Sequence, residues 1–177
     1  STDNSLEIIS EFKNDITLIK NKNNKGVGYC SNQGIEASKG KHWMRVDSDD
    51  FLNCYATAIT GMLFDENPDI SFIYSDYYKV DMRGVKIKKI KLDNEETRFE
   101  YGAGINFRTE ILKSVNGFDP DLRNCEDYDL LIKLKKKGIL GFYLPIPLYR
   151  YYIHGKNITL TKEREFYKKK VREKYGI

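Results

Sequence analysis

Three carboxylates within four positions, Asp47, Asp49 and Asp50, directly follow an apolar run and form the stretch of this sequence best suited to chemistry. Carboxylates this close repel one another, so a cation or a network of donors must offset the repulsion. Mg²⁺ and Mn²⁺ bind such stretches through one or two carboxylates and take their other ligands from water and substrate phosphates. The alternative is a solvated acidic turn, because Asp is a favoured N-cap residue and Asn53 begins a plausible helix. The stretch alone does not decide between a metal site and a capping turn.

A second acidic pair, Glu126 and Asp127, opens a strongly predicted helix. Acidic residues in a first turn complement the helix dipole, and this is a sufficient reason for them to occur there. The functional interpretation is that one of the pair is a general base, held at the start of a rigid helix and directed into a cleft above a sheet. The position of the pair along the chain does not distinguish these interpretations.

The elements that must position these carboxylates alternate between helix and strand. Apolar spacing and capping patterns predict helices at 5–13, 27–38 and 53–66. Runs of β-branched and aromatic residues predict strands at 16–20, 42–46, 70–80 and 85–92, with a turn at Arg83-Gly84. This order indicates a layered α/β domain with a mostly parallel sheet. The strand at 42–46 then ends at the acidic loop, on the sheet edge where open α/β sheets bind ligands.

Beyond residue 92 the pattern changes to shorter elements. A polar linker is expected at 93–98, followed by a Gly102-Ala103-Gly104 segment. The remaining predictions are helices at 109–115 and 125–137, strands at 140–144 and 148–153 around two prolines, and a basic terminal helix at 161–175.

Length and composition are those of one globular domain with a buried core, at 177 residues. No stretch has the ~18 apolar residues of a membrane span. Three widely spaced cysteines without a Cys-x-x-Cys pair argue against a disulfide framework or a zinc site and indicate a reducing, cytoplasmic setting. The net charge of +4 lies entirely in residues 161–177, which argues against binding of nucleic acid. For the helix at 161–175 we expect either a peripheral contact with anionic lipid at the inner membrane face or a solvated basic face.

Several short motifs occur in an order that resembles family 2 glycosyltransferases. They are Asn32-Gln33-Gly34-Ile35, Ala37 with Gly40, Val46-Asp47-Ser48-Asp49-Asp50, Gly117-Phe118-Asp119, Glu126-Asp127-Tyr128-Asp129-Leu130 and Tyr149-Arg150-Tyr151-Tyr152-Ile153-His154. The resemblance implies a GT-A fold, a Rossmann-like layered αβα sandwich at 1–160. Residues 1–52 would form part of the nucleotide-binding half and residues 53–160 the acceptor and catalytic half, followed by the basic helix at 161–177.

The resemblance also implies a donor and a metal ion for the acidic stretch at Asp47, Asp49 and Asp50. The donor is a nucleoside-diphosphate sugar bound through Mn²⁺ or Mg²⁺, with Asp47 and Asp49 as the Asp-x-Asp motif at the ribose and the metal–diphosphate. Asn32 is assigned to the donor as well, and Asp50 shares the metal-binding role. His154 is similar in position to a family histidine that reaches the metal or diphosphate. A packing or surface role is the alternative for this histidine.

For the acidic pair Glu126 and Asp127 the resemblance implies a catalytic role. Asp127 is similar in position to the family's catalytic base, and Glu126 is the second choice. A carboxylate that takes the proton of an acceptor hydroxyl makes it a better nucleophile, while a metal stabilises charge on the leaving diphosphate. The implied reaction is an inverting single displacement onto a glycan or lipid-linked acceptor. Arg108, Arg150 and Lys156 are further candidates for phosphate contacts, although exposed basic side chains usually only solvate a surface.

The beginning of the chain departs from the family pattern. Members open with a strand, a helix and a second strand that ends in an acidic loop, and Ser1-Thr2-Asp3 is similar to the last residues of that loop. We therefore expect the first βαβ portion to be absent, a hydrophobic sheet edge to be exposed and the chain to self-associate. A subunit-dependent partner and a non-catalytic metal-binding module are alternatives to an enzyme. An EF-hand is disfavoured, because Leu52 and Ala58 occupy its Gly and Glu positions.

Overall fold

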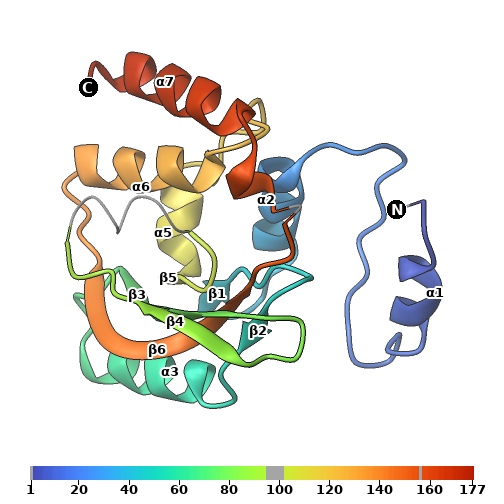
Figure 1. The fold of residues 1–177 in the computed structure, drawn as a ribbon. Helices are drawn as coiled ribbons and strands as arrows, with labels where there is room; N and C mark the ends of the chain where they lie inside the picture. The colour runs from blue at the N-terminus through green and yellow to red at the C-terminus, as the bar shows by residue number, and fades with distance from the viewer. Residues whose placement is uncertain (1, 95–101, 156) are drawn as a thin grey trace.

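A curled mixed sheet forms the centre of the fold, with α3 against one face and α2, α5 and α6 on the other (Figure 1). The computed structural model describes residues 2–94, 102–155 and 157–177. The helices are α1 (Ser5–Ser10), α2 (Val27–Ala37), α3 (Ala56–Glu66), α5 (Thr109–Ser114), α6 (Glu126–Lys136), α7 (Glu163–Tyr175) and a 3₁₀ turn η1 (Ile158–Leu160). The strands are β1 (His42–Met44), β2 (Phe51–Leu52), β3 (Phe72–Val80), β4 (Lys86–Ile90), β5 (Asn106–Arg108) and β6 (Phe142–Tyr152). Most of the predicted linker at 93–98 lies outside the described residues, as does Ser1.

The strands pair in the order β1-β5-β3-β6-β2, with β4 added to β3. The long central strands β3 and β6 are parallel, with Ile73 opposite Phe142 at one end and Val80 opposite Tyr152 at the other. The other pairs among the described strands are antiparallel, whereas the sequence predicted a mostly parallel sheet. One reason is the tight turn after β3, where the Asp81 carboxylate accepts backbone N–H bonds from the residues that follow. So short a connection returns the chain antiparallel, because parallel strands need a longer crossover.

The predicted strands at 140–144 and 148–153 form a single strand, β6, that runs through Pro145 and Pro147. Its register against β3 shifts between Ser75 and Tyr77, at the level of the two prolines. Proline cannot donate to a ladder, and an irregularity of this kind accommodates it within a sheet. The strand therefore continues past the prolines and carries its last residues to the end of β1.

Apolar side chains fill the space on both faces of the sheet. The predicted stripe of α6 supplies Leu130 and Leu134, which pack with Tyr74 and Tyr149 in the larger cluster. On the other face, α3 supplies Ala56 and Phe64 to a smaller cluster with Ile73, Leu144 and Leu148. No helix among the described residues has both the length and the apolar character to cross a membrane.

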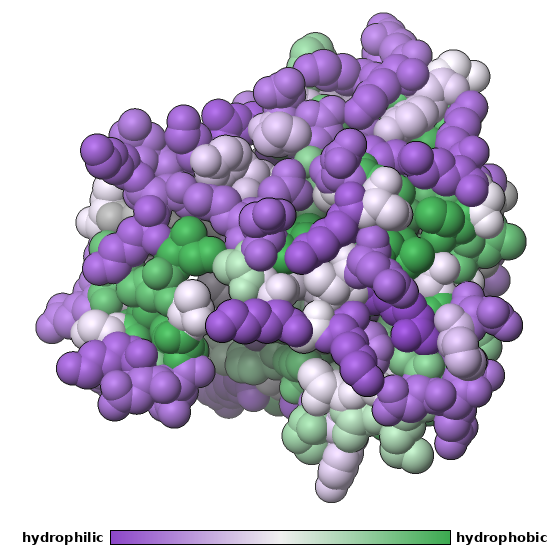
Figure 2. Space-filling model, turned by 180° about the vertical axis from the view of Figure 1, so that it is seen from behind, coloured by the Kyte–Doolittle hydropathy of each residue, from purple (hydrophilic) through white to green (hydrophobic). Residues whose placement is uncertain are grey.

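The N-terminal segment stands apart from the sheet and the helices that cover it (Figure 1). The predicted strand at 16–20 is extended but has no partner strand within the described residues, because pairing depends on a neighbour and not on local sequence alone. Its Ile16, Leu18 and Ile19 are between 40% and 44% exposed. Hydrophobic side chains accordingly gather on this side of the molecule in the view from behind (Figure 2).

Candidate active site

The acidic loop after β1 and the acidic pair of α6 line one cavity of about 510 Å³. Asp47 and Asp49 line it from the loop after β1, and Glu126 and Asp127 from the first turn of α6. His154, just after β6, also lines it, as do residues of η1 and α7. Contacts between residues 81 and 105 positions apart thus form at the end of β1, where the sequence predicted the ligand site.

The acidic loop is held in place by the end of β6. The backbone N–H of Asp47 donates to the Tyr149 hydroxyl at 3.1 Å, and the Asp50 carboxylate accepts the backbone N–H of Tyr152 at 2.8 Å. The loop closes on itself as the Asp50 N–H donates to the Asp47 carbonyl at 3.1 Å. The carboxylate of Asp50 is therefore directed at β6, and Asp47 and Asp49 are left to face the cavity.

Arg45 joins the loop to the acidic pair of α6. Its Nε lies 3.0 Å from Asp47 Oδ1, and its Nη1 donates to Glu126 Oε1 at 2.8 Å. Its Nη2 lies 3.9 Å from Asp127 Oδ2. The Arg45 side chain is only 13% exposed, so a single largely buried guanidinium is shared by three carboxylates. Planar guanidinium donors suit such multiple pairing better than an ammonium does.

Burial and neighbouring charges shift the pKa values of the carboxylates around Arg45. Burial raises the pKa of Asp47, and the neighbouring charges of Asp127 and Asp49 add to the rise against the opposing effect of Arg45. Burial and then Asp127 raise the pKa of Glu126 in the same way. Burial also raises the pKa of Asp50 to about 6. Arg45 thus compensates its carboxylates only in part, and negative charge remains around the acidic loop and the first turn of α6.

Asp127 is the more accessible member of the acidic pair. Its side chain is 24% exposed against 10% for Glu126, whose carboxylate is occupied by Arg45. Asp127 Oδ1 accepts the backbone N–H of Tyr128 at 2.7 Å, which fixes the orientation of the carboxylate. Gly102 packs so closely that a Cβ at this position would collide with the Asp127 side chain. A glycine is therefore required beside the candidate base.

His154 contacts Asp49 directly, with 2.9 Å between Nε2 and Oδ2. The backbone N–H of His154 donates to the Asn157 side chain, which in turn donates to the Tyr152 carbonyl. Asn157 is 5% exposed, so a buried amide orients the turn that carries the histidine. The structure therefore places His154 at the acidic loop, with its side chain 25% exposed.

The residues at this site fit a metal ion whose coordination is completed by water and substrate. Among the described residues no three His, Cys, Asp or Glu side chains are grouped to hold an ion by themselves. Mg²⁺ and Mn²⁺ need fewer protein ligands, because water and substrate phosphates complete the octahedron. Asp49, 43% exposed and paired with His154, offers such a partial site, whereas Asp47 is engaged by Arg45.

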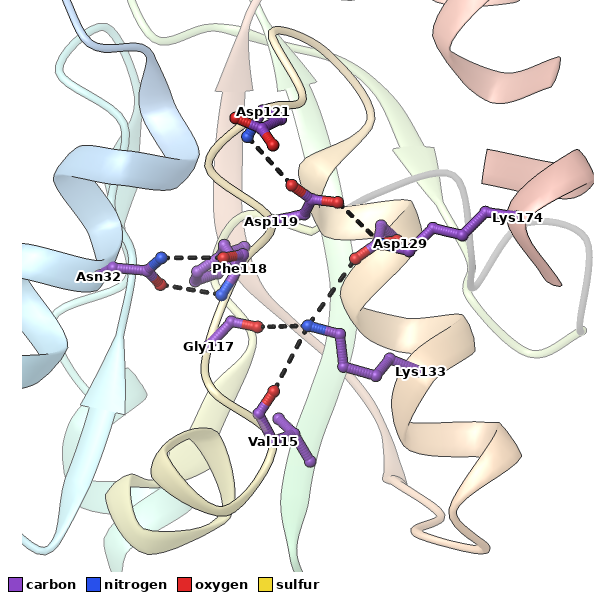
Figure 3. Close-up of polar contacts among 9 residues, drawn as sticks. All are labelled: Asn32, Val115, Gly117, Phe118, Asp119, Asp121, Asp129, Lys133 and Lys174. Atoms are coloured by element: carbon purple, nitrogen blue, oxygen red, sulfur yellow. Dashed lines mark hydrogen bonds and ion pairs between the residues drawn. The ribbon is translucent and has the colours of Figure 1, made fainter. Parts of the chain in front are cut away.

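Asn32 does not line the cavity, although the resemblance assigns it to the donor. Its amide makes two hydrogen bonds with the backbone of Phe118, each 2.8 Å long (Figure 3). Both polar groups of the side chain are thereby committed to the turn after α5. The guanidinium of Arg108 donates to carbonyls at the end of α3, and Lys156 lies outside the described residues.

Three contributors to the site were assigned no role from the sequence: Arg45, Gly102 and Tyr149. Arg45 could have been suspected as a basic residue within an apolar strand and two positions from an acidic cluster. Gly102 was noted only as part of a Gly-Ala-Gly segment, and Tyr149 only as part of a motif. Their roles depend on contacts across the fold, which local sequence does not encode.

Comparison with known proteins gives a family match and several relatives. The model of the family described as "Glycosyl transferase family 2" matches residues 1–115. A hyaluronan synthase from Pasteurella multocida is 27% identical over 170 residues, which are 92% of this chain and 17% of that protein. A chondroitin synthase from Escherichia coli is 26% identical over 170 residues, 92% of this chain and 25% of that protein. The chain thus spans a quarter or less of the length of these relatives.

Two solved structures share the fold. S. aureus TarS 1–349 in complex with UDP-GlcNAc has a TM-score of 0.75 and 21% identity, over 95% of this chain and 52% of that one. The mannosyltransferase PcManGT from Pyrobaculum calidifontis, in complex with GDP-Man and Mn²⁺, has a TM-score of 0.64 and 13% identity, over 89% of this chain and 46% of that one. At such identities the likeness concerns the fold, and it confirms the expected GT-A architecture.

Proposed function

Because the chain belongs to glycosyl transferase family 2, we propose that it transfers a sugar from a nucleoside-diphosphate donor to a hydroxyl of a glycan or lipid-linked acceptor. The observation that carries the proposal is that Asp47 and Asp49 on one segment and Asp127 on another line the same cavity. Arg45 contacts both segments, at 3.0 Å from Asp47 and 3.9 Å from Asp127. A direct displacement requires that the donor-binding loop and the base border the same space.

Asp127 is the proposed general base. An acceptor hydroxyl is a poor nucleophile until its proton is taken, and a carboxylate fixed at the start of α6 can take that proton as the new bond forms. The hydrogen bond from the Tyr128 N–H leaves Asp127 Oδ2 directed toward Arg45 and the cavity. Glu126 is the weaker candidate, because its carboxylate is tied to Arg45 at 2.8 Å. Attack from the side opposite the leaving diphosphate would invert the anomeric carbon.

Asp49 and His154 are the proposed holders of a divalent ion, with Asp47 beside them. When bound, the ion would stabilise the negative charge that grows on the leaving diphosphate. The pairing of Asp49 with His154 fixes the carboxylate before substrate arrives, and the buried Asn157 fixes the histidine turn. Mn²⁺ and Mg²⁺ are both compatible with this oxygen-rich donor set.

The comparisons support a nucleotide-sugar donor without naming the sugar. TarS is described in complex with UDP-GlcNAc and PcManGT in complex with GDP-Man and Mn²⁺. Two of the relatives are polysaccharide synthases, which supports a glycan as the acceptor. We extend these properties to this chain as part of the proposal.

The test separates donor binding from chemistry. Release of UDP from UDP-GlcNAc and of GDP from GDP-mannose is followed with and without Mn²⁺, and calorimetry measures the affinity for the nucleoside diphosphate. Asp127→Asn should keep the affinity and lower turnover about 10²- to 10⁴-fold, as expected for loss of a general base. Asp49→Asn should weaken the Mn²⁺-dependent binding itself. Asp65→Asn, an exposed change on α3, is the matched control. Turnover retained in both site variants would refute the assignment.

A further inference from the structure

α7 is fastened to the catalytic half by a charged network and an apolar contact. Lys174 donates to Asp119 Oδ2 at 2.8 Å and to Asp129 Oδ1 at 2.7 Å, and the side chain of Asp129 has no exposed surface (Figure 3). Val171, also fully buried, packs in a cluster with Leu122. These contacts bind the C-terminal half of α7 to α6, which itself begins with the acidic pair. The position of α7 relative to the cavity is therefore fixed by the fold.

The N-terminal half of α7 contributes basic side chains to the same cavity. Arg164 and Lys168, one helical turn apart, line it together with Arg123 from the loop before α6. The backbone at Arg164 is tied to the start of α6, since its carbonyl accepts from Cys125 Sγ at 3.5 Å. The ammonium of Lys168 lies 5.9 Å from the ring centroid of Tyr128. Arg164 and Lys168 thus line the same cavity as the first turn of α6.

Apart from Arg45, the acidic residues of the cavity and its Arg and Lys residues come from different elements. The acidic residues come from the loop after β1 and the first turn of α6, and Arg45 is paired with them. The other Arg and Lys residues come from residue 123 and α7. A divalent ion is attracted to the first set and repelled by the second, which suits an anion instead. The family model ends at residue 115, so none of these three basic residues belongs to the matched region.

We propose that Arg123, Arg164 and Lys168 form a subsite for an anionic group, a carboxylate or a phosphate, on the acceptor glycan. The proposal rests on the proposed function and names the substrate class of that same site. The anionic group is assigned to the acceptor and not to the donor because Lys168 lies over the ring of Tyr128, which directly follows the candidate base Asp127. An anionic group of the acceptor close to the reacting hydroxyl would therefore be within reach of the basic side chains of α7. The diphosphate of the donor has its own site at the acidic loop.

Binding to three chemically defined probes tests the subsite. The probes are an oligosaccharide ending in glucuronate, the neutral analogue ending in glucose, and a glycerol-phosphate oligomer, each titrated into the full chain by calorimetry or NMR. The double variant Arg164→Gln/Lys168→Gln should bind one or both anionic probes about tenfold more weakly, since charged hydrogen bonds are lost. Its affinity for the neutral probe and for UDP with Mn²⁺ should not change. Which anionic probe responds identifies the charged group as a carboxylate or a phosphate.

The control is Lys169→Gln/Lys170→Gln, which removes the same charge from exposed positions of α7. An equal loss in this control would refute the subsite and indicate general attraction to a basic helix. A loss of UDP affinity in Arg164→Gln/Lys168→Gln would refute it in favour of the donor diphosphate. Equal binding of anionic and neutral probes by the wild type would refute it as well. Lys168→Gln alone repeats the test if the double variant does not fold. Failure of the proposed function would be distinct, since it would show as absent binding of UDP in the wild type.

Discussion

Replacing Arg45 by methionine is expected to be among the most damaging single changes in this cavity. The substitution keeps an unbranched side chain but removes the charge shared by Asp47, Glu126 and Asp127, at 3.0, 2.8 and 3.9 Å. Removing one partner from a largely buried ion pair leaves uncompensated charge and costs about 3–5 kcal/mol. Total stabilities of domains are about 5–15 kcal/mol, so Arg45→Met should unfold at a much lower urea concentration. Arg45→Lys should be intermediate, because an ammonium keeps the charge but not the fork of donors.

Urea unfolding at neutral pH measures this effect, with Arg83→Met in the exposed hairpin turn as control. The control should stay within about 0.5 kcal/mol of the wild type, as surface changes usually do. Combining Arg45→Met with Glu126→Gln gives a double-mutant cycle. The double variant should lose less free energy of unfolding than the sum of the losses in the two single variants, by about 0.5–3 kcal/mol. The reason is that Glu126→Gln removes a charge that Arg45→Met leaves unpaired. Additive losses, or a wild-type midpoint for Arg45→Met, would refute the view that Arg45 compensates these carboxylates.

Two further predictions concern residues outside the cavity. Asn32→Ala should lower the free energy of unfolding by about 1–3 kcal/mol, since it leaves both backbone groups of Phe118 unpaired. Its affinity for UDP with Mn²⁺ should not change, whereas a donor-binding Asn32 would lower that affinity. Burial acts against ionisation of Asp76, but hydrogen bonds from Tyr143 and Lys89 hold its pKa below the ordinary value of 3.8. This carboxylate therefore contributes stability above about pH 4 that is lost as the pH falls through the lowered pKa. Acid unfolding followed by circular dichroism should be less steep in Asp76→Asn, and an unchanged acid limb would contradict the assignment.

The sequence predicted those elements whose pattern is local. α6 was expected at 125–137 and runs from Glu126 to Lys136, because an apolar stripe, a basic last turn and a glycine stop agree with one another. The strand at 16–20 was expected from its apolar residues but finds no partner among the described strands. The break expected at Pro145 and Pro147 is absent, because a register shift against β3 absorbs both prolines. Pairing partners and registers are properties of the whole fold, which explains these differences.

The same division applies to the site. Asp47, Asp49, Asp127 and His154 were named from the sequence, and the structure brings them to one cavity, whereas the carboxylate of Asp50 is directed at β6. Asn32 was named with them, yet its amide is committed to Phe118. Residue type and motif order could identify side chains capable of the chemistry. They could not show which polar groups are already satisfied within the protein, and that decides which of them remain for a ligand.

Arg45 also bears on where a cation would act. Its guanidinium is shared among Asp47, Glu126 and Asp127, whereas Asp49 meets His154 instead. The pKa of Asp47 is still raised, by burial first and then by the charges of Asp127 and Asp49, so one arginine does not neutralise this group. A divalent ion at Asp49 would oppose the remaining repulsion without competing for Arg45. Such an arrangement leaves Asp127 its partial contact with Arg45 and its access to the cavity, so that donor binding and proton transfer can depend on different carboxylates of one network.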